Sequence, residues 1–110
     1  MEPISIDDFK KVEIHVGEIL SAETIEKSDK LLKLRVGFGE LGERQVLSGI
    51  AAFYPDPSAL VGKRVPFVTN LAPRMMMGLE SQAMILATGG DETNPFSLFE
   101  TNAAPGSKVR

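Results

Sequence analysis

The sequence predicts an all-β fold: an OB-fold, five-stranded Greek-key barrel with short helices and a C-terminal extension. Three observations support this class. About five short segments carry the residue alternation of strands, turns rich in glycine and proline separate them, and one small helical turn lies between the third and fourth. The strand spacing alone also fits an SH3-like barrel or half of a β-sandwich. The length of 110 residues predicts a single domain over residues 1–110, with a core large enough to need no disulfide or metal.

The first elements are a short helix and a strand. Ser5 is a typical helix N-cap, and the helix is expected to end near Lys11. Residues 12–16 then alternate between apolar and polar side chains, as a half-buried strand does. Gly17 predicts a bulge or tight bend, after which residues 19–20 continue the strand.

The second strand has the clearest pattern in the chain. A turn is predicted at Ser28-Asp29, and residues 32–38 then place apolar side chains on one face and basic ones on the other. Residues 37–42 match the string GxGxxG, but they join two strands and open no helix. We therefore interpret them as a turn leading into a third strand over residues 44–48.

The second half of the chain completes the predicted barrel. Pro66 lacks an amide donor, so its place in the fourth strand is expected at an edge or a bulge. The tail is polar, and we expect it to be loosely held. The elements predicted for this half of the chain are an end of regular structure at 55–57, a helical turn at 58–62, strands at 65–69, 83–88 and 96–99, and the tail at 101–110.

Composition excludes several classes of function. The chain has no cysteine, no signal peptide and no apolar run long enough for a membrane helix, so a cytoplasmic location and no membrane partner are predicted. His15 is the single histidine, and we interpret it as a surface or barrel-wall residue. With no metal-ligand spacing and no cofactor loop, we expect no metal, no cofactor and no catalysis by this chain alone.

Charge is distributed unevenly along the chain. The net charge is −3, yet residues 27–74 hold eight basic and four acidic side chains, whereas residues 1–26 hold two basic and seven acidic. A local basic patch, more than net charge, is what attracts a phosphate backbone. A solvated face with scattered lysines and arginines accounts for the same counts.

Four separated segments together resemble one family. They are IDDFKKVEIHVGEIL (residues 6–20), SDKLLKLRV (28–36), QVLSGIAAFYPDPSALVGKRV (45–65) and NLAPRMMMGLESQAMIL (70–86). In order and spacing they are similar to the tRNA-binding domain found at the C-terminus of methionyl-tRNA synthetases and as free-standing dimeric proteins. The resemblance implies an OB-fold, a homodimer, possible attachment to the catalytic part of a methionyl-tRNA synthetase, and binding to the outer corner of folded tRNA by shape.

The resemblance also implies which residues bind. Lys33 and Arg35 on the second strand would join Lys30 and Arg44 in one basic patch that positions the RNA through its phosphates. The residues that match the family's motifs are Lys30, Lys33, Ser48, Gly49, Asn70, Pro73, Arg74, Ser81 and Met84.

One motif departs from the family pattern. The family carries Pro-Arg-Lys-Met-Arg-Gly, and this chain has Pro73-Arg74-Met75-Met76-Met77-Gly78. Met76 is then the family's apolar residue, expected to be buried, while Met75 and Met77 replace two charges. The Gly that the family carries before the last strand's Met is Ala83. Consecutive methionines do not converge on one point, so a Cu(I) site is not expected.

Three functions stay open at this point. The first is tRNA binding, and the scarcity of exposed aromatic residues favours shape recognition over single-strand capture, because only Phe53 and Tyr54 are expected to be exposed. The second is a protein-interaction or dimerisation module that has lost RNA affinity. The third is a chaperone-like binder of unfolded peptides. A last strand carrying Phe96, Leu98 and Phe99 predicts a covered edge and hence a dimer, unless these residues pack on their own barrel.

Overall fold

A computed structural model describes residues 1–110 and consists mostly of strands. The all-β prediction is confirmed. No helix is long and apolar enough to cross a membrane. The elements in chain order are α1 (Ile6–Phe9), β1 (Ile14–Ile25), β2 (Ser28–Gly37), η1 (Gly39–Leu41), β3 (Glu43–Ser48), η2 (Ala51–Phe53), η3 (Pro57–Leu60), β4 (Arg64–Val68), β5 (Arg74–Met76), β6 (Leu79–Ser81), β7 (Met84–Ile85), β8 (Ala87–Thr88) and β9 (Ser97–Leu98).

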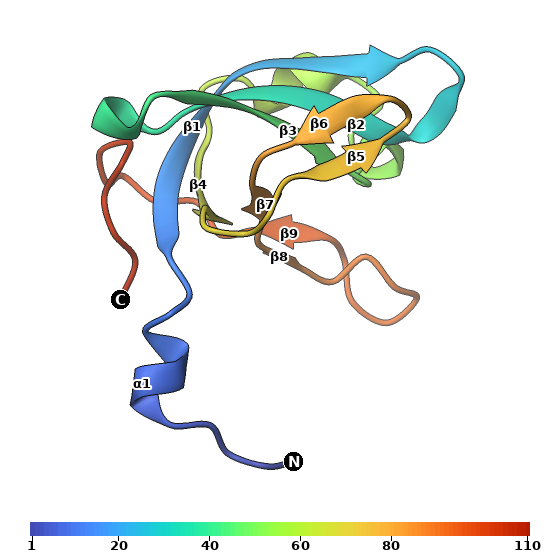
Figure 1. Ribbon diagram of the computed structural model, residues 1–110. Helices are drawn as coiled ribbons and strands as arrows, with labels where there is room; N and C mark the ends of the chain where they lie inside the picture. Colours follow the sequence, from blue (N-terminus) through green and yellow to red (C-terminus); the bar gives the residue numbers. More distant parts are fainter.

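Five strands form one antiparallel sheet in the order β3-β2-β1-β4-β7 (Figure 1). The sheet curls until its two ends meet. The amide of Gln82, just before β7, donates to the Gln45 carbonyl in β3 at 2.9 Å, and the Gln45 amide donates back to Gln82 Oε1 at 2.9 Å. The Leu47 amide donates to Ser81 Oγ at 3.0 Å. These bonds close the sheet around a single core.

The core follows from the alternation in β2. Leu32, Leu34 and Val36 are fully buried, whereas Lys33 and Arg35 point to the opposite face of the strand. The other strands contribute their inward positions to the same cluster. Its members are Ile19, Leu32, Leu34, Val36, Phe38, Val46, Ile50, Leu60, Val65, Phe67 and Ala83.

Gly17 lies in a regular part of β1, so the prediction of a bulge at Gly17 is wrong. The register with β2 shifts between Ile19 and Ser21 instead. A Cβ at Gly17 would lie 2.5 Å from Val36 Cγ1 and 2.7 Å from Phe38 Cε1. The glycine is therefore required by close packing, the other reason for glycine inside a strand.

Two boundaries and the place of Pro66 differ from the sequence predictions. The tight turn between β1 and β2 is at Glu26-Lys27 and not at Ser28-Asp29, although Ser28 Oγ accepts the amides of Lys30 and Leu31 in an irregular segment that follows. The strand predicted over residues 83–88 is divided into β7 and β8. Pro66 lies in β4 between β1 and β7, and its carbonyl accepts the Leu86 amide at 3.1 Å, so the strand edge predicted there is not found.

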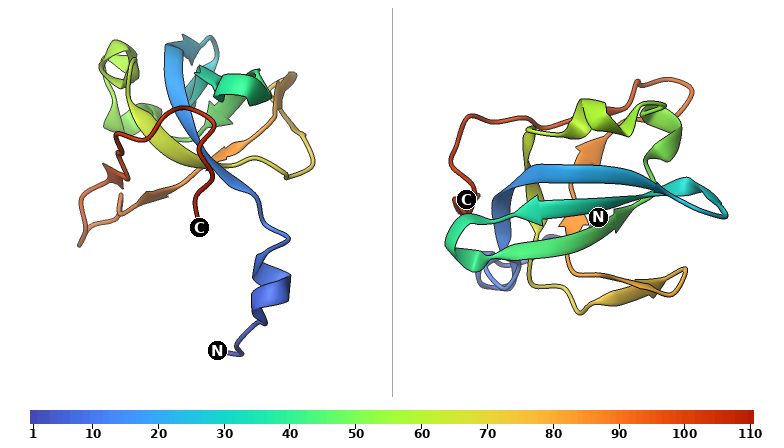
Figure 2. Two further views of the ribbon diagram at one scale, coloured as in Figure 1. Left: turned by 90° about the vertical axis from the view of Figure 1, so that its left-hand side faces the viewer. Right: turned by 90° about the horizontal axis from the view of Figure 1, so that it is seen from above.

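The prediction that the C-terminal tail is loosely held is wrong, because the tail pairs with β1. The amide of Val16 donates to the Ser107 carbonyl at 2.8 Å, and the amide of Gly106 donates to the Val16 carbonyl at 2.7 Å. The amide of Val109 donates to the Ile14 carbonyl at 2.8 Å. The tail thus covers the part of the β1 edge that β2 leaves free (Figure 2).

Residues 70–82, which connect the strands predicted at 65–69 and 83–88, contain a hairpin that the sequence did not indicate. Strands β5 and β6 pair Arg74 with Ser81 and Met76 with Leu79. The turn is Met77-Gly78, with φ values of 52° and 78°, as a type I′ hairpin turn requires. Met75 and Met77 are exposed as expected, while Met76 is half-buried and not fully buried.

The N-terminal arm, residues 1–12, extends away from the sheet (Figures 1 and 2). The predicted Ser5 cap is confirmed, since its hydroxyl accepts the amide of Asp8 at 3.1 Å. Helix α1 buries no residue, and Ile4, Ile6 and Phe9 on the arm are exposed.

Candidate nucleic-acid interface

The outer face of β2 brings two of the predicted site residues together. Lys33 and Arg35 lie on the same side of the strand, opposite Glu23 and Ser21 of β1 in the register. Lys30 is exposed in the irregular segment at the start of the same strand. We call Lys30, Lys33 and Arg35 the basic face.

Acidic neighbours moderate the charge of the basic face. Arg35 Nε donates to Glu43 Oε1 at 3.1 Å, and both side chains are about half exposed. Lys30 and Lys33 form no ion pair. An exposed pair of this kind is weak, about 0–1 kcal/mol, so Arg35 can exchange Glu43 for a phosphate at little cost.

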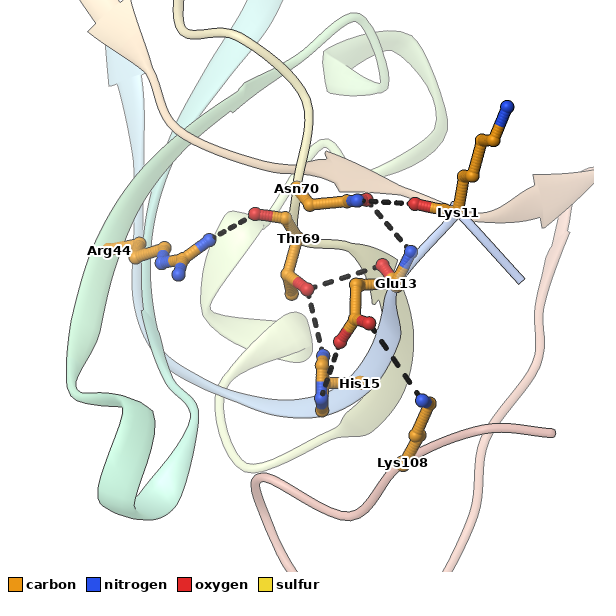
Figure 3. Close-up of polar contacts among 7 residues, drawn as sticks. All are labelled: Lys11, Glu13, His15, Arg44, Thr69, Asn70 and Lys108. Carbon is orange, nitrogen blue, oxygen red and sulfur yellow. Dashed lines mark hydrogen bonds and ion pairs between the residues drawn. The ribbon is translucent and has the colours of Figure 1, made fainter. Parts of the chain in front are cut away.

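Arg44 does not lie on the basic face. The sequence predicted one patch of four cations, and the structure brings only Lys30, Lys33 and Arg35 of these four together. Arg44 is opposite Val36 in the register, on the inward side of β3. Its Nη1 donates to the Thr69 carbonyl at 2.5 Å and to the Gln82 carbonyl at 3.4 Å, and its guanidinium lies 5.7 Å from the centre of the Phe38 ring. Arg44 therefore ties β3 to the end of β4 across one end of the barrel (Figure 3).

Two other predicted site residues use their polar atoms inside the chain. The side chain of Asn70 accepts the amide of Glu13 at 2.8 Å and donates to the Lys11 carbonyl at 2.6 Å, which anchors the base of the N-terminal arm (Figure 3). Ser81 is buried, accepts the Leu47 amide and donates to the Ala83 carbonyl at 3.2 Å. Ser81 is buried and has no polar atom at the surface, whereas Asn70 is exposed and also anchors the arm.

Arg74 and Ser48 complete the predicted set. Arg74 is exposed on the β5–β6 hairpin and forms no ion pair, so it is a free cation. Ser48 is half-buried at the end of β3, opposite Leu32. The hairpin lies beside β3, where Gln45 Nε2 donates to the Glu80 carbonyl at 3.0 Å (Figure 2). The outer face of β2 and β3 is consequently bordered by the hairpin.

A polar network around His15 was missed by the sequence reasoning. His15 Nδ1 lies 2.8 Å from Thr69 Oγ1, and Nε2 lies 3.8 Å from Glu13 Oε1. Lys108 of the tail reaches Glu13 Oε2 at 3.8 Å (Figure 3). The network joins the arm, β1, the end of β4 and the tail. No local pattern marks it, because its members are up to 95 residues apart in the sequence.

The aromatic side chains are used inside the chain. Phe53 stacks on Phe96 with ring centres 4.4 Å apart, and Tyr54 meets the edge of Phe96 at 5.9 Å. Burial in this cluster raises the pKa of the Tyr54 hydroxyl. Phe38 and Phe67 are fully buried in the core, whereas Phe99, beside the predicted last strand's Leu98, is exposed. Phe53 keeps 41% exposure, so the expectation of an exposed aromatic pair holds for Phe53 only.

Solved structures and sequences with this fold define the class of protein. The crystal structure of a MetRS-related protein from Pyrococcus horikoshii matches with a TM-score of 0.91 and 37% identity, over the full length of both chains. A CsaA chaperone protein from Picrophilus torridus matches with a TM-score of 0.85 and 26% identity, over 98% of this chain and all of that chain.

Sequence comparison leads to the family. The methionine–tRNA ligase of Methanoregula boonei is 54% identical over 110 residues, which is 97% of this chain and 16% of that protein. The chain spans about 15% of the length of the methionine–tRNA ligases it matches. The model of the putative tRNA-binding domain matches residues 14–108. The chain belongs to this tRNA-binding domain family, and the resemblance seen in the sequence is confirmed.

Proposed function

We propose that residues 1–110 are one non-catalytic tRNA-binding domain that recognises folded tRNA through the basic face and Arg74. The observation that carries the proposal is the outer face of β2, where Lys30 and Lys33 have no acidic partner and Arg35 has an exchangeable one. Phosphate contacts from such side chains supply affinity and position but no sequence readout. With few aromatic side chains exposed, recognition rests on shape, as is usual for folded RNA.

The barrel topology supports the same surface. In OB-folds, nucleic acids bind on the face of the second and third strands and the loops that flank it. We assign the curled sheet to this type because β3 closes against the segment before β7. The β1–β2 hairpin and the β5–β6 hairpin then flank the basic face.

The relatives suggest two settings for the domain. One is an appendage of a methionyl-tRNA synthetase, where it would hold tRNA for a catalytic part, as the ligase relatives suggest. The other is a free-standing protein, a setting suggested by the MetRS-related protein from Pyrococcus horikoshii, whose solved chain matches this chain over its full length. We propose that in either setting the domain meets tRNA in the cytoplasm.

Binding to an unfractionated tRNA pool, compared with an unstructured RNA of equal length, tests the proposal. We expect tighter binding to folded tRNA and an affinity that falls as salt rises, with a log–log slope of about −0.7 to −0.9 for each phosphate contacted. Equal affinity for both RNAs would contradict shape recognition. No binding at low salt would contradict the function itself and favour a module for protein contacts.

We also propose that the chain forms a homodimer in which each N-terminal arm docks on the partner. Phe96 and Leu98 pack against their own core, so the covered edge predicted from these residues does not require a partner. The arm, in contrast, exposes Ile4, Ile6 and Phe9 at 67%, 66% and 46%. A four-residue helix is too short to persist without packing, so a covering surface is expected.

A groove beside β1 suits the arm of a partner. It is lined by apolar side chains of Val16, Pro66, Phe99 and Val109, and at its polar rim by Lys108 and Glu100, which pair with Glu13 and Lys63. Two-fold exchange would fill both grooves with the same contact.

Light scattering at micromolar concentration tests the dimer. We expect about twice the monomer mass of 11.9 kDa for the natural chain, and a shift to the monomer mass for Phe9→Ser. Val61→Ser, an exposed apolar residue away from the arm and the groove, should leave the mass unchanged. A natural chain that is monomeric at this concentration would rule the dimer out.

A further inference from the structure

Two methionines are exposed at the border of the proposed tRNA surface. Met75 is 67% exposed and Met77 is 56% exposed, and neither packs against the hydrophobic core. Met75 is paired with Glu80 in the hairpin, on the side away from the buried Ser81. Their side chains therefore contribute little to the stability of the fold, and exposed apolar side chains grouped on one hairpin mark a contact surface.

The backbone at Met77 supports a role outside the fold. Its φ of 52° belongs to the left-handed region, which asparagine and glycine adopt far more readily than methionine. A methionine here makes the turn less favourable than an asparagine would. Local strain of this kind is found at functional positions, where the side chain is needed for something other than the turn.

The neighbouring surface indicates what the methionines meet. The hairpin is joined to β3 by the bond from Gln45 to the Glu80 carbonyl, and Gln45 is opposite Arg35 of the basic face in the register. An RNA held by its phosphates on the basic face would extend along the hairpin. The rings of Phe53, Tyr54 and Phe96 are engaged with one another. Met75 and Met77 are the most exposed apolar side chains of the hairpin region, at 67% and 56% against 46% for Leu71 and 45% for Met84.

We infer that Met75 and Met77 pack against unstacked loop bases of the bound RNA; the inference rests on the proposed tRNA binding. The thioether is polarisable and makes favourable contacts with aromatic rings. Unstacked bases of folded RNA expose such rings and are what proteins grip outside helical regions. Contacts of this kind depend little on salt, unlike the contacts of the basic face to phosphate.

The test uses Met75→Ser with Met77→Asn in the full chain. Asparagine suits the φ of the turn, so the hairpin is kept while both apolar side chains are lost. With an unfractionated tRNA pool we expect affinity to fall about 10-fold, the effect of losing base-stacking contacts, with an unchanged salt slope. Val61→Ser is the matched control, being an apolar residue of similar exposure remote from the hairpin.

A second RNA probe distinguishes contacts to bases from contacts to phosphates. On a fully paired RNA duplex without loops, the double variant should bind as the natural chain does, because no unstacked base is present. Met75→Lys with Met77→Lys should instead bind duplex and tRNA more tightly at low salt and steepen the slope by up to about two. If the natural chain binds tRNA and the Ser/Asn variant binds equally well, this inference is wrong and the tRNA-binding function stands. If the natural chain binds no tRNA, both fail.

Discussion

Reversing both charges on the outer face of β2, with Lys33→Glu and Arg35→Glu, is expected to lower tRNA affinity about 100-fold at moderate salt. Each substitution removes one phosphate contact and adds a repulsive charge. The loss of Arg35 also frees Glu43, which pairs with it at 3.1 Å and would then face the RNA. Filter binding across a salt series would measure the change, and the salt slope should flatten by about two.

The control for this variant is Lys10→Glu with Arg110→Glu. Both residues are exposed and form no ion pair. Because Lys10 belongs to the arm proposed to dock on a partner, light scattering checks that this variant keeps the mass of the natural chain. The net charge changes by the same amount, so a general loss of electrostatic attraction would affect both variants alike. Equal loss of affinity in both variants would show that the basic face is not the binding surface, and unfolding is checked by circular dichroism of each.

The sheet could be predicted from local patterns where one face of a strand is buried. In β2 the apolar residues at 32, 34 and 36 alternate with Lys33 and Arg35, and period-two alternation fixes which side chains turn outward. The outward direction of Lys33 and Arg35, two of the three residues of the basic face, could therefore be predicted from the sequence. The strand ends were less certain, because the turn at Glu26-Lys27 contains no glycine or proline to mark it.

The positions of Arg44, Asn70 and Ser81 could not be predicted in the same way. Each resembles a surface residue by type, but each is held by a carbonyl or amide far away in the sequence: Thr69 for Arg44, Lys11 and Glu13 for Asn70, Leu47 for Ser81. Buried polar groups are retained where they satisfy backbone groups that the sheet leaves unpaired. Such partners appear only once the sheet has closed, so residue type alone could not show that these three side chains also hold the fold together.

The backbone partners of the C-terminal tail could not be predicted from the sequence either. Its polar composition indicated a loose end, yet its amides and carbonyls complete the edge of β1 at Ile14 and Val16. Strand pairing of this kind depends on main-chain groups, which every residue carries, and so leaves little trace in side-chain composition. The tail and the arm both meet β1, which explains why the His15 network joins them.

Gly17→Ala is expected to destabilise the domain by about 2–3 kcal/mol through overpacking of the core. The added methyl group would lie 2.5 Å from Val36 Cγ1, 2.7 Å from Phe38 Cε1 and 2.9 Å from Phe67 Cδ1. All three side chains are fully buried, and the two rings are in edge-to-face contact with centres 5.3 Å apart. Since a close-packed core has no space into which they can retreat, the strands themselves must separate.

Urea unfolding of Gly17→Ala beside Gly49→Ala isolates this steric effect. A Cβ at Gly49 meets nothing within 4 Å and needs no unusual backbone, so the control changes the same atoms without a clash. If the two variants lose equal stability, close approach at Gly17 is not the reason for the glycine. A further variant, Gly17→Ala with Val36→Ala, removes the nearest clashing atom, and the two substitutions should then cost less together than the sum of their separate costs. Protein concentration is held constant throughout, because dimer formation would add to the apparent stability.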